Sequence, residues 1–402
     1  MNWGNLPASM DPQDLAEVGC VMTAVTLGRR GLLRFAGLLS GAVAAGASGW
    51  VLATPVAAEA DAAASETIAN LSLNENPWGP SPRAQQAMLR NIASNHRYAG
   101  AETQALIRKI AELENVSPDT IVLAPGSSPL LRILGDQFAT DLPGGELITA
   151  TATFEVLFRA FAARGGDVVH VPLDDQLRFD LDAMASRIGS RTAGIYVCNP
   201  NNPTGTALSV DALRAFATEA ARTAPVFIDE AYVDMMDDWP RSSCMDLARA
   251  GHDVVICRTL SKLHGLAGAR IGFAVMRKER ADRVRAAARS GGLPRMGVVA
   301  ALASLDDEAF VTEARQRLRA GRLALERVVA EAGLEYAHGS QANYVYVNTG
   351  MPNERFVGLM AEQNVLVVRR SFQGYDNWNR ICVGTDAEIE HCRRALARVL
   401  AA

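Results

Sequence analysis

Short apolar runs alternate with amphipathic stretches along the chain from about residue 100. The stretches between the runs, such as residues 157–166 and 210–223, repeat apolar residues at helical spacing. Continuous apolar runs are typical of strands that are buried on both faces, and intervening helices connect parallel strands. The pattern predicts an α/β chain with a largely parallel sheet between helices. The predicted strands are TIVLA (120–124), GELITA (145–150), DVVHVPL (167–173), AGIYVCN (193–199), APVFIDEAY (224–232), VVICRTL (254–260) and RIGFAV (270–275).

The pattern changes near residue 290. A long stretch rich in Ala, Arg, Glu and Leu (residues 307–333) is followed by three further apolar runs and a last amphipathic segment. We therefore expect a large domain over residues 101–289 and a smaller α+β domain over residues 290–402.

The first sixty residues do not share this alternation. Arg29, Arg30 and Arg34 precede a stretch rich in Ala, Gly, Leu and Val that ends in the small-residue pattern Ala-Glu-Ala at 58–60. This order is typical of an export signal, and the paired arginines resemble a twin-arginine signal, which carries folded proteins across a membrane. A retained anchor and an ordinary buried helix are the alternatives. We expect residues 1–60 to lie outside the fold and the protein to be exported, to the periplasm; a cytoplasmic or membrane-anchored protein is the alternative.

Composition narrows the classes of partner. The formal net charge is -4, and Lys and Arg are spread along the chain, so no basic face for nucleic acid is expected. The cysteines lie far apart, with no CxxC pair and no histidine at metal-ligand spacing, so we expect buried thiols and no metal site. Small molecules are the expected partners. The cysteines are Cys20, Cys198, Cys244, Cys257, Cys382 and Cys392.

Polar residues follow several of the predicted strands. Open α/β sheets bind ligands at the carboxyl ends of their strands, which makes these positions site candidates. Each is weak alone, because Gly/Ser turns and NPTG are common turns and a single lysine is most often a surface charge. Their order and their placement at strand ends give them weight together. They are Pro125-Gly126-Ser127-Ser128, which could offer N–H groups to a phosphate, NPNNPTGT (199–206), Asp229 with Glu230 and Tyr232, and Thr259 with Ser261 and Lys262.

Seven segments in this order resemble the fold type I pyridoxal-phosphate aminotransferases, and within them the histidinol-phosphate aminotransferase-like branch. The resemblance covers roughly residues 70–398. It implies a large domain with a mostly parallel sheet, a smaller α+β domain, the cofactor pyridoxal 5'-phosphate, and a homodimer with an N-terminal arm over residues 61–100. The segments are SLNENPWGPSP (72–82), RYAGAE (97–102), APGSSPLL (124–131), NPNNPTGT (199–206), FIDEAY (227–232), TLSKLHGLAGARIGF (259–273) and NRICVGT (379–385).

The resemblance also implies which residues carry the chemistry. Lys262 would hold the cofactor as a Schiff base and then act as the general base that moves the substrate proton. Asp229 would keep the pyridine nitrogen protonated, so that the ring can accept electrons. Asn202 and Tyr232 would bond the phenolic oxygen, and Phe154 would stack on the ring. The implied phosphate ligands are Gly126, Ser127, Ser128, Thr259, Ser261 and Arg270, with Tyr98 reaching the phosphate of the neighbouring subunit.

Substrate residues follow from the same resemblance. Arg380 would hold the α-carboxylate of the substrate or an equivalent polar group. Arg369 would contribute to a substrate phosphate, although Arg370 follows it directly and a surface or dimer-interface charge is the other interpretation. Asn76 and Asn343 complete the implied set, which contains no metal ligand.

One position departs from the family pattern, and the role of one aromatic segment has two interpretations. Pro129 stands where the family often has an acidic residue, and we expect a helix to start there, because proline suits the first helical turn. Phe372, Tyr375 and Trp378 could line an aromatic substrate pocket or pack the small domain.

The sequence as a whole predicts an aminotransferase that exchanges an amino group between an amino acid or amine and a 2-oxo acid. A decarboxylase or lyase on the same scaffold and a protein that only binds the cofactor are the alternatives. L-histidinol phosphate with 2-oxoglutarate is one substrate pair. Because histidine biosynthesis is cytosolic, an export signal would favour a different donor, for example an aromatic amino acid.

Overall fold

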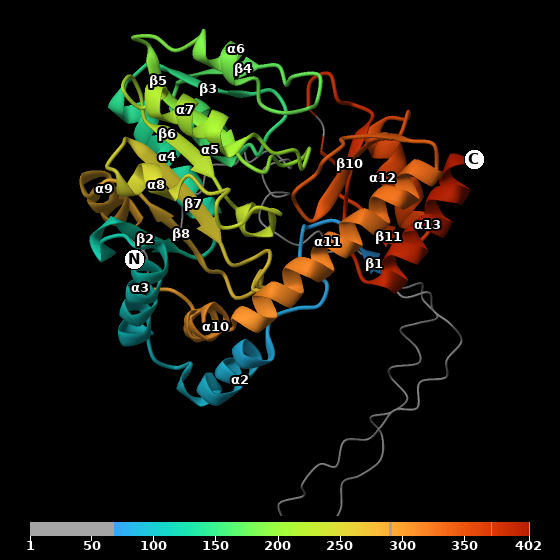
Figure 1. Cartoon of the computed structure of the whole chain (residues 1–402), viewed down its shortest axis with the longest axis horizontal. Helices are drawn as coiled ribbons and strands as arrows, with labels where there is room; N and C mark the ends of the chain where they lie inside the picture. The colour runs from blue at the N-terminus through green and yellow to red at the C-terminus, as the bar shows by residue number, and fades with distance from the viewer. Residues whose placement is uncertain (1–67, 289–291, 371, 402) are drawn as a thin grey trace, which may run out of the picture. The chain divides into compact units, whose positions relative to one another are not determined.

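The large sheet contains seven strands. The computed structural model describes residues 68–288, 292–370 and 372–401, so the proposed signal over residues 1–60 and Cys20 lie outside the described residues. The strand order is β2-β8-β7-β6-β5-β3-β4, and β8 is antiparallel to both neighbours while the other pairs are parallel (Figure 1). All seven predicted strands are present, which confirms the α/β class. Their bounds are β2 Ile121–Ala124, β3 Glu146–Ala150, β4 Asp167–Val171, β5 Thr192–Cys198, β6 Val226–Asp229, β7 Val254–Thr259 and β8 Gly272–Val275.

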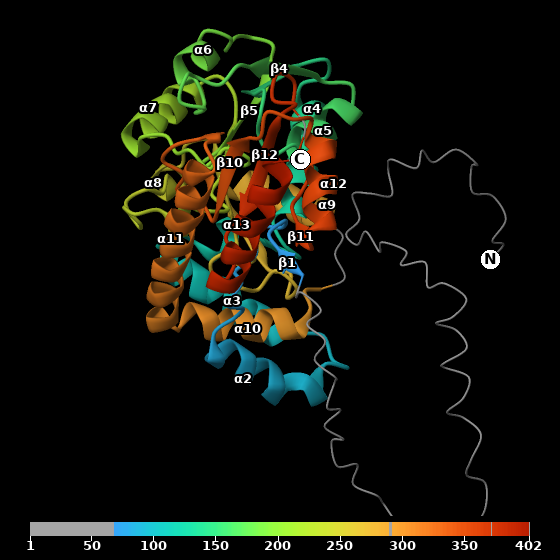
Figure 2. The same ribbon diagram turned by 90° about the vertical axis from the view of Figure 1, so that its right-hand side faces the viewer.

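Helices cover both faces of this sheet. In Figure 2, α7 and α8 lie on one side of it, and α4, α5 and α9 lie on the other. The central strands β5, β6 and β7 are buried along their whole length, as a sheet between two helix layers requires. The helices of this part are α2 Pro82–Asn91, α3 Gly100–Glu114, α4 Ser128–Asp141, α5 Val156–Ala163, α6 Leu181–Ala185, α7 Val210–Ala220, α8 Met245–Arg249, α9 Lys278–Ala288 and α10 Arg295–Leu305, with short 3-10 turns at Ile92–Ser94, Pro118–Thr120 and Val233–Met235.

A second group of elements surrounds a three-stranded antiparallel sheet of order β12-β10-β9. Strand β1 pairs in parallel with β11, which ties the beginning of the described chain to its C-terminal part. The apolar run at 364–370 pairs in this way only at Val365 and Leu366, and Val368 makes a single bridge to Arg380. The elements are β1 Ala69–Asn70, α11 Glu308–Glu331, β9 Glu335–Tyr336, β10 Tyr344–Asn348, α12 Asn353–Glu362, β11 Val365–Leu366, β12 Trp378–Cys382 and α13 Asp386–Leu400.

Two apolar cores correspond to these two groups. The first includes the strands of the large sheet and the buried side chains of α10, such as Val298 and Ala301. The second is built by α11, α12, α13, β10 and β12, and it also includes Leu71 and Tyr232. Tyr232 follows β6 of the large sheet, so its side chain joins the two cores.

Two expectations concern the buried thiols and the aromatic segment. The five cysteines within the described residues are all buried and free, as predicted. Tyr375 and Trp378 pack on Tyr346, with ring centroids 6.4 and 5.1 Å away, so these two aromatic residues pack the small domain. Among the described helices, none is both long and apolar enough to cross a membrane.

Candidate functional site

The predicted site residues gather at one edge of the large sheet. Cys198, Asp229 and Cys257 stand level with one another on β5, β6 and β7, so the loops after these strands begin at the same height. Strand β8 runs the opposite way, and its first residue pairs with the last residues of β2 and β7. The loop before β8, which carries Arg270, therefore joins the loops that follow the parallel strands. A cavity of about 340 Å³ opens there; its lining includes Ser127, Ser128, Phe154, Asn202, Asp229, Tyr232, Thr259, Ser261, Lys262, Arg270 and Arg380.

Lys262 is the lysine at this cavity, and the sequence contains only two others. Lys109 and Lys278 form ion pairs of 2.6 Å with Asp306 and Asp282. The Nζ of Lys262 instead donates a hydrogen bond of 3.0 Å to the carbonyl of Leu73. Burial, with Arg380 nearby, lowers the pKa of Lys262 to about 8. A sizeable fraction of this amine is therefore neutral and nucleophilic near neutral pH.

Asp229 ends strand β6 and is almost fully buried. Its carboxylate accepts hydrogen bonds from the Tyr196 hydroxyl, at 3.2 Å, and from the Ala231 N–H, at 3.1 Å. Burial raises the pKa of Asp229 to about 6, because these donors do not replace the lost water. A buried carboxyl that lines a cavity without a cationic partner in contact suits a ligand that brings a positive charge, such as a protonated pyridine nitrogen.

The start of α4 forms an anion site. Gly126 has a φ of +88°, and a Cβ there would lie 2.1 Å from Nη2 of Arg270, so only glycine lets the guanidinium approach. Helix α4 begins at Ser128 with Pro129 in its first turn, which confirms the predicted helix start. Ser127 makes no side-chain capping bond, which leaves its hydroxyl and the helix N–H groups to a phosphate.

The remaining phosphate candidates are close to this turn. The Thr259 hydroxyl donates to the Ser261 hydroxyl at 2.9 Å. Arg270 donates to the carbonyls of Ala267 and Pro125, at 2.8 and 3.1 Å, which fix its guanidinium beside the turn. The donors, the glycine and the helix terminus together suit a phosphate monoester.

Arg380 reaches the cavity from β12. Its two terminal nitrogens donate to Oδ1 of Asn202 and to the carbonyl of Ser72, both at 2.7 Å. Its guanidinium lies 5.3 Å from the ring centroid of Tyr344. Arg380 is 2% exposed, and its Nε has no hydrogen-bond partner among the described residues, so it is held in place with a donor to spare. Such an arginine suits a substrate carboxylate.

Arg370, and not Arg369, lines the cavity. Arg370 is half-buried and lies 3.4 Å from the carboxylate of Glu155. Arg369 has a largely exposed side chain, 3.7 Å from Glu354. A shift of one residue along an extended segment moves a side chain to the opposite face, which explains why the sequence left the choice between the two arginines open.

Besides Arg369 and Gly126, three predicted residues do not line the cavity of this chain. Asn76 donates to the carbonyl of Leu263, at 2.8 Å, and Asn343 donates to the carbonyl of Glu75, at 3.1 Å. Both amides therefore anchor the segment around residues 73–76, which forms one wall. Tyr98 is 90% exposed, as a residue that reaches into a neighbouring subunit would be.

The sequence did not point to four residues of the site. Leu73, Asn74 and Glu75 line the cavity, and they belong to a segment that was recognised without a role for them. Tyr196 supports Asp229 from within the apolar strand β5. A tyrosine at the centre of a buried strand is itself a signal, because its hydroxyl needs a partner.

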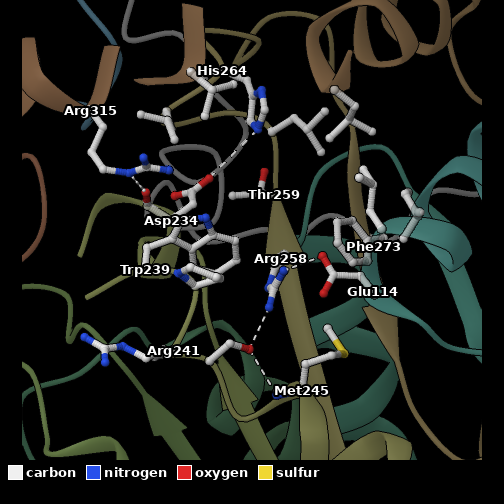
Figure 3. A pocket seen from close by; sticks show the side chains of 18 of the residues that line it. Glu114, Asp234, Trp239, Arg241, Met245, Arg258, Thr259, His264, Phe273 and Arg315 are labelled. Atoms are coloured by element: carbon white, nitrogen blue, oxygen red, sulfur yellow. Dashed lines mark hydrogen bonds and ion pairs between the residues drawn. The ribbon is translucent and has the colours of Figure 1, made fainter. Parts of the chain in front are cut away.

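A larger cavity, of about 760 Å³, is lined in part by the residues on either side of Lys262 in the chain, including Leu260 and His264 (Figure 3). Its most buried charge, Arg258, pairs with Glu230 at 2.9 Å and Glu114 at 2.6 Å, and it lies over the ring of Trp239. These charges satisfy one another and hold strand β7 to its neighbours. The smaller cavity, which contains the lysine and a buried carboxyl that forms no ion pair among the described residues, is therefore the candidate active site.

Comparisons with known proteins agree with this geometry. Residues 66–396 match the model of the family "Aminotransferase class I and II". The histidinol-phosphate aminotransferases of Halalkalibacterium halodurans and Moorella thermoacetica are 30% and 32% identical to the chain, over 84% and 83% of it and 90% and 86% of their own length. The structure of histidinol-phosphate aminotransferase from Sinorhizobium meliloti in complex with pyridoxal-5'-phosphate has a TM-score of 0.75 and 27% identity, covering 83% of this chain and 91% of that one. The chain belongs to the class I and II aminotransferases and is a pyridoxal-phosphate-dependent transaminase of the histidinol-phosphate aminotransferase-like type.

Proposed function

We propose that the chain transfers an amino group from L-histidinol phosphate, which carries a phosphate and no carboxylate, to 2-oxoglutarate. The observation that carries this proposal is the pair of arginines at the Lys262 cavity, Arg370 and Arg380. The names of the relatives support the same donor. Two arginines at one cavity suit the two carboxylates of glutamate and 2-oxoglutarate, and either arginine can bond the single phosphate of L-histidinol phosphate.

The residues of the cavity have separate roles in the reaction. Bound pyridoxal phosphate supplies an aldehyde that takes up the amino group and a ring that holds the electron pair left when the Cα proton departs. Lys262, whose pKa is lowered to about 8, takes that proton from one carbon and returns it to another. Asp229 holds the ring nitrogen in its protonated form. Arg380 fixes the substrate so that its Cα proton faces Lys262.

The surroundings of Arg370 suit an anion of moderate charge. Glu155 lies between two arginines, 3.4 Å from Arg370 and 2.9 Å from Arg159. The three side chains carry a net charge of about one positive unit, because one carboxylate opposes two guanidinium groups. A substrate phosphate or distal carboxylate can bond Arg370 while Glu155 keeps its second partner.

Half-reactions test the substrate. The protein is loaded with pyridoxal phosphate, and L-histidinol phosphate, glutamate and phenylalanine are added separately while the absorbance of the lysine-bound cofactor is followed. We expect loss of this absorbance with glutamate and with L-histidinol phosphate, and its recovery with 2-oxoglutarate. If L-histidinol phosphate gives no loss while glutamate does, this donor is wrong but transamination stands. Release of CO₂ without the aminated cofactor would instead indicate the decarboxylase.

The pair Arg29-Arg30 supports an exported enzyme as a second candidate, with a donor found outside the cytoplasm. A reporter fused after residue 60 tests export, and substitution of both arginines by lysine should abolish it. A reporter that stays inside the cell, or export that survives the double substitution, rules out this route and leaves L-histidinol phosphate first.

The exposure of Tyr98 supports a homodimer in which this residue completes the partner's phosphate site. A mixture of Lys262→Ala subunits and Tyr98→Ala subunits should recover activity, because one site of each hybrid dimer then has both native residues. A monomer in light scattering, or no recovery in the mixture, would contradict this arrangement.

A further inference from the structure

Asn74 lies between Tyr232 of the cavity and Cys382 of β12. The Asn74 Nδ2 donates to the Tyr232 hydroxyl oxygen at 2.8 Å, and the Cys382 thiol donates to the Asn74 Oδ1 at 2.9 Å. The Asn74 backbone N–H in turn donates to the Cys382 sulfur at 3.2 Å. All three side chains are less than 5% exposed, so water does not compete for these bonds.

The thiol decides which way the Asn74 amide points. Its sulfur already accepts the Asn74 N–H, so its own proton is directed to a second acceptor, which is the Oδ1. The NH₂ end of the amide must then face Tyr232. Asn74 has a φ of +54°, a left-handed conformation that asparagine adopts more readily than most residues, which holds the side chain between its two partners.

The direction of these bonds determines whether the Tyr232 hydroxyl donates or accepts a hydrogen bond at the cavity. Its oxygen accepts from Asn74, so the phenolic proton is left for another acceptor. Tyr232 lines the cavity, with its ring centroid 6.0 Å from the Nζ of Lys262. The acceptor that the family cofactor brings to this place is its phenolic oxygen.

We propose that Cys382 and Asn74 are positioning residues that hold Tyr232 as a hydrogen-bond donor to the phenolic oxygen of the bound cofactor. This inference rests on the proposed place of Tyr232 beside that oxygen. Cys382 acts through Asn74, and Asn74, which itself lines the cavity, acts here through its bond to Tyr232, so both have a positioning role.

Residues of strand β12 contact Asn202 directly and Tyr232 through Asn74, and these are the two residues expected to bond the phenolic oxygen. Arg380 and Cys382 are two residues apart on β12, so their side chains leave the same face of the strand. Arg380 bonds Asn202, and Cys382 reaches Tyr232 through Asn74. The substrate-binding arginine and the thiol are thus held on one rigid element next to the reacting atoms.

The physical consequence is a change in the acidity of the lysine–cofactor link. A hydrogen bond donated to the phenolic oxygen withdraws electron density from that oxygen. It therefore lowers the pKa of the proton that the oxygen shares with the nitrogen of the lysine–cofactor link. Loss of that donor should raise the pH midpoint of the absorbance change of the loaded protein. Loss of one hydrogen bond of about 1 kcal/mol corresponds to a shift of about 0.7 pH units.

The test is a pH titration of the absorbance of loaded variants. Cys382→Val removes both hydrogen-bonding functions of the thiol and should raise the midpoint by about 0.5 to 1 pH unit. Cys382→Ser keeps a donor and an acceptor and should restore it to within about 0.2 units of the native value. Asn74→Asp presents an acceptor to Tyr232 and should raise the midpoint further, because the phenol then donates to the carboxylate.

Cys392→Val provides the matched control, because Cys392 is a fully buried thiol of the same apolar core, stands on α13 and does not line the cavity. Its midpoint should equal that of the native protein. The inference is overturned if Cys382→Val behaves like the Cys392 control, or if Cys382→Ser shifts as far as Cys382→Val. If Cys382→Val does not fold, an unshifted midpoint in Asn74→Asp overturns it equally. Failure of the native protein to form any lysine-bound band would refute the cofactor assignment instead, so the two failures are distinct.

Discussion

The buried carboxyl of Asp229 should destabilise the cofactor-free protein. Its folded-state pKa is about 6, against an ordinary value of 3.8, so folding favours the protonated form. The resulting loss of stability begins as the pH rises above about 4 and is complete above about 6. It amounts to about 3 kcal/mol at pH 8 and about half of that at pH 5.

Asp229→Asn removes this titration and keeps the shape of the side chain. The amide oxygen can still accept from the Ala231 N–H, and the amide nitrogen can donate to the Tyr196 hydroxyl oxygen. The variant should therefore gain stability over the native protein without its cofactor, by roughly 1 to 2 kcal/mol more at pH 8 than at pH 5. The same variant should lose much of the stabilisation that pyridoxal phosphate gives, because the ring nitrogen loses its anionic partner.

Urea unfolding of both cofactor-free proteins at the two pH values measures this difference. All other titrating groups are common to the two proteins, so their contributions cancel in the comparison. An equal stability difference at pH 5 and pH 8 would refute the reasoning, since it would mean that Asp229 has an ordinary pKa in the folded protein.

Three further substitutions or conditions give separate tests. Gly126→Ala should weaken cofactor binding by about tenfold or more, measured by equilibrium dialysis, because its Cβ would displace Arg270 and its φ is strained; unchanged affinity would contradict the proposed phosphate site. Arg370→Ala should raise the KM for a doubly anionic substrate by about 10- to 100-fold while Arg369→Ala should change it little, and equal effects would show that neither arginine meets the substrate. The rate at which free pyridoxal phosphate attaches to Lys262, followed by stopped-flow absorbance, should rise with pH around a midpoint near 8, and a midpoint near 10 would contradict the lowered pKa.

The large sheet could be predicted because its strands carry a local signal. Runs such as GIYVC and VFI are apolar along their whole length, and the helices between them repeat at helical spacing. The edge at which the site forms followed from the same pattern, because parallel strands end together. The reversed direction of β8 could not be predicted, since an apolar run reads alike in a parallel and an antiparallel strand.

The support of the site depends on contacts that no local pattern encodes. Asn74 and Cys382 are 308 residues apart, and each alone looks like an ordinary polar or buried residue. The choice between Arg369 and Arg370 depends on how the chain leaves β11. Asn76 and Asn343 belong to recognised segments, but their amides bond backbone carbonyls. The recognised segments thus located the site, whereas the direction of each side chain could be known only from the fold.

Reduction of the loaded protein with borohydride, followed by peptide mapping, tests the central claim most directly. The chain offers only three lysines, and two of them form exposed ion pairs with Asp306 and Asp282. The account predicts that the reduced cofactor is found on the peptide that contains Lys262 and on neither of the other two. Labelling of Lys109 or Lys278 in its place, or no stable label at all, would contradict it.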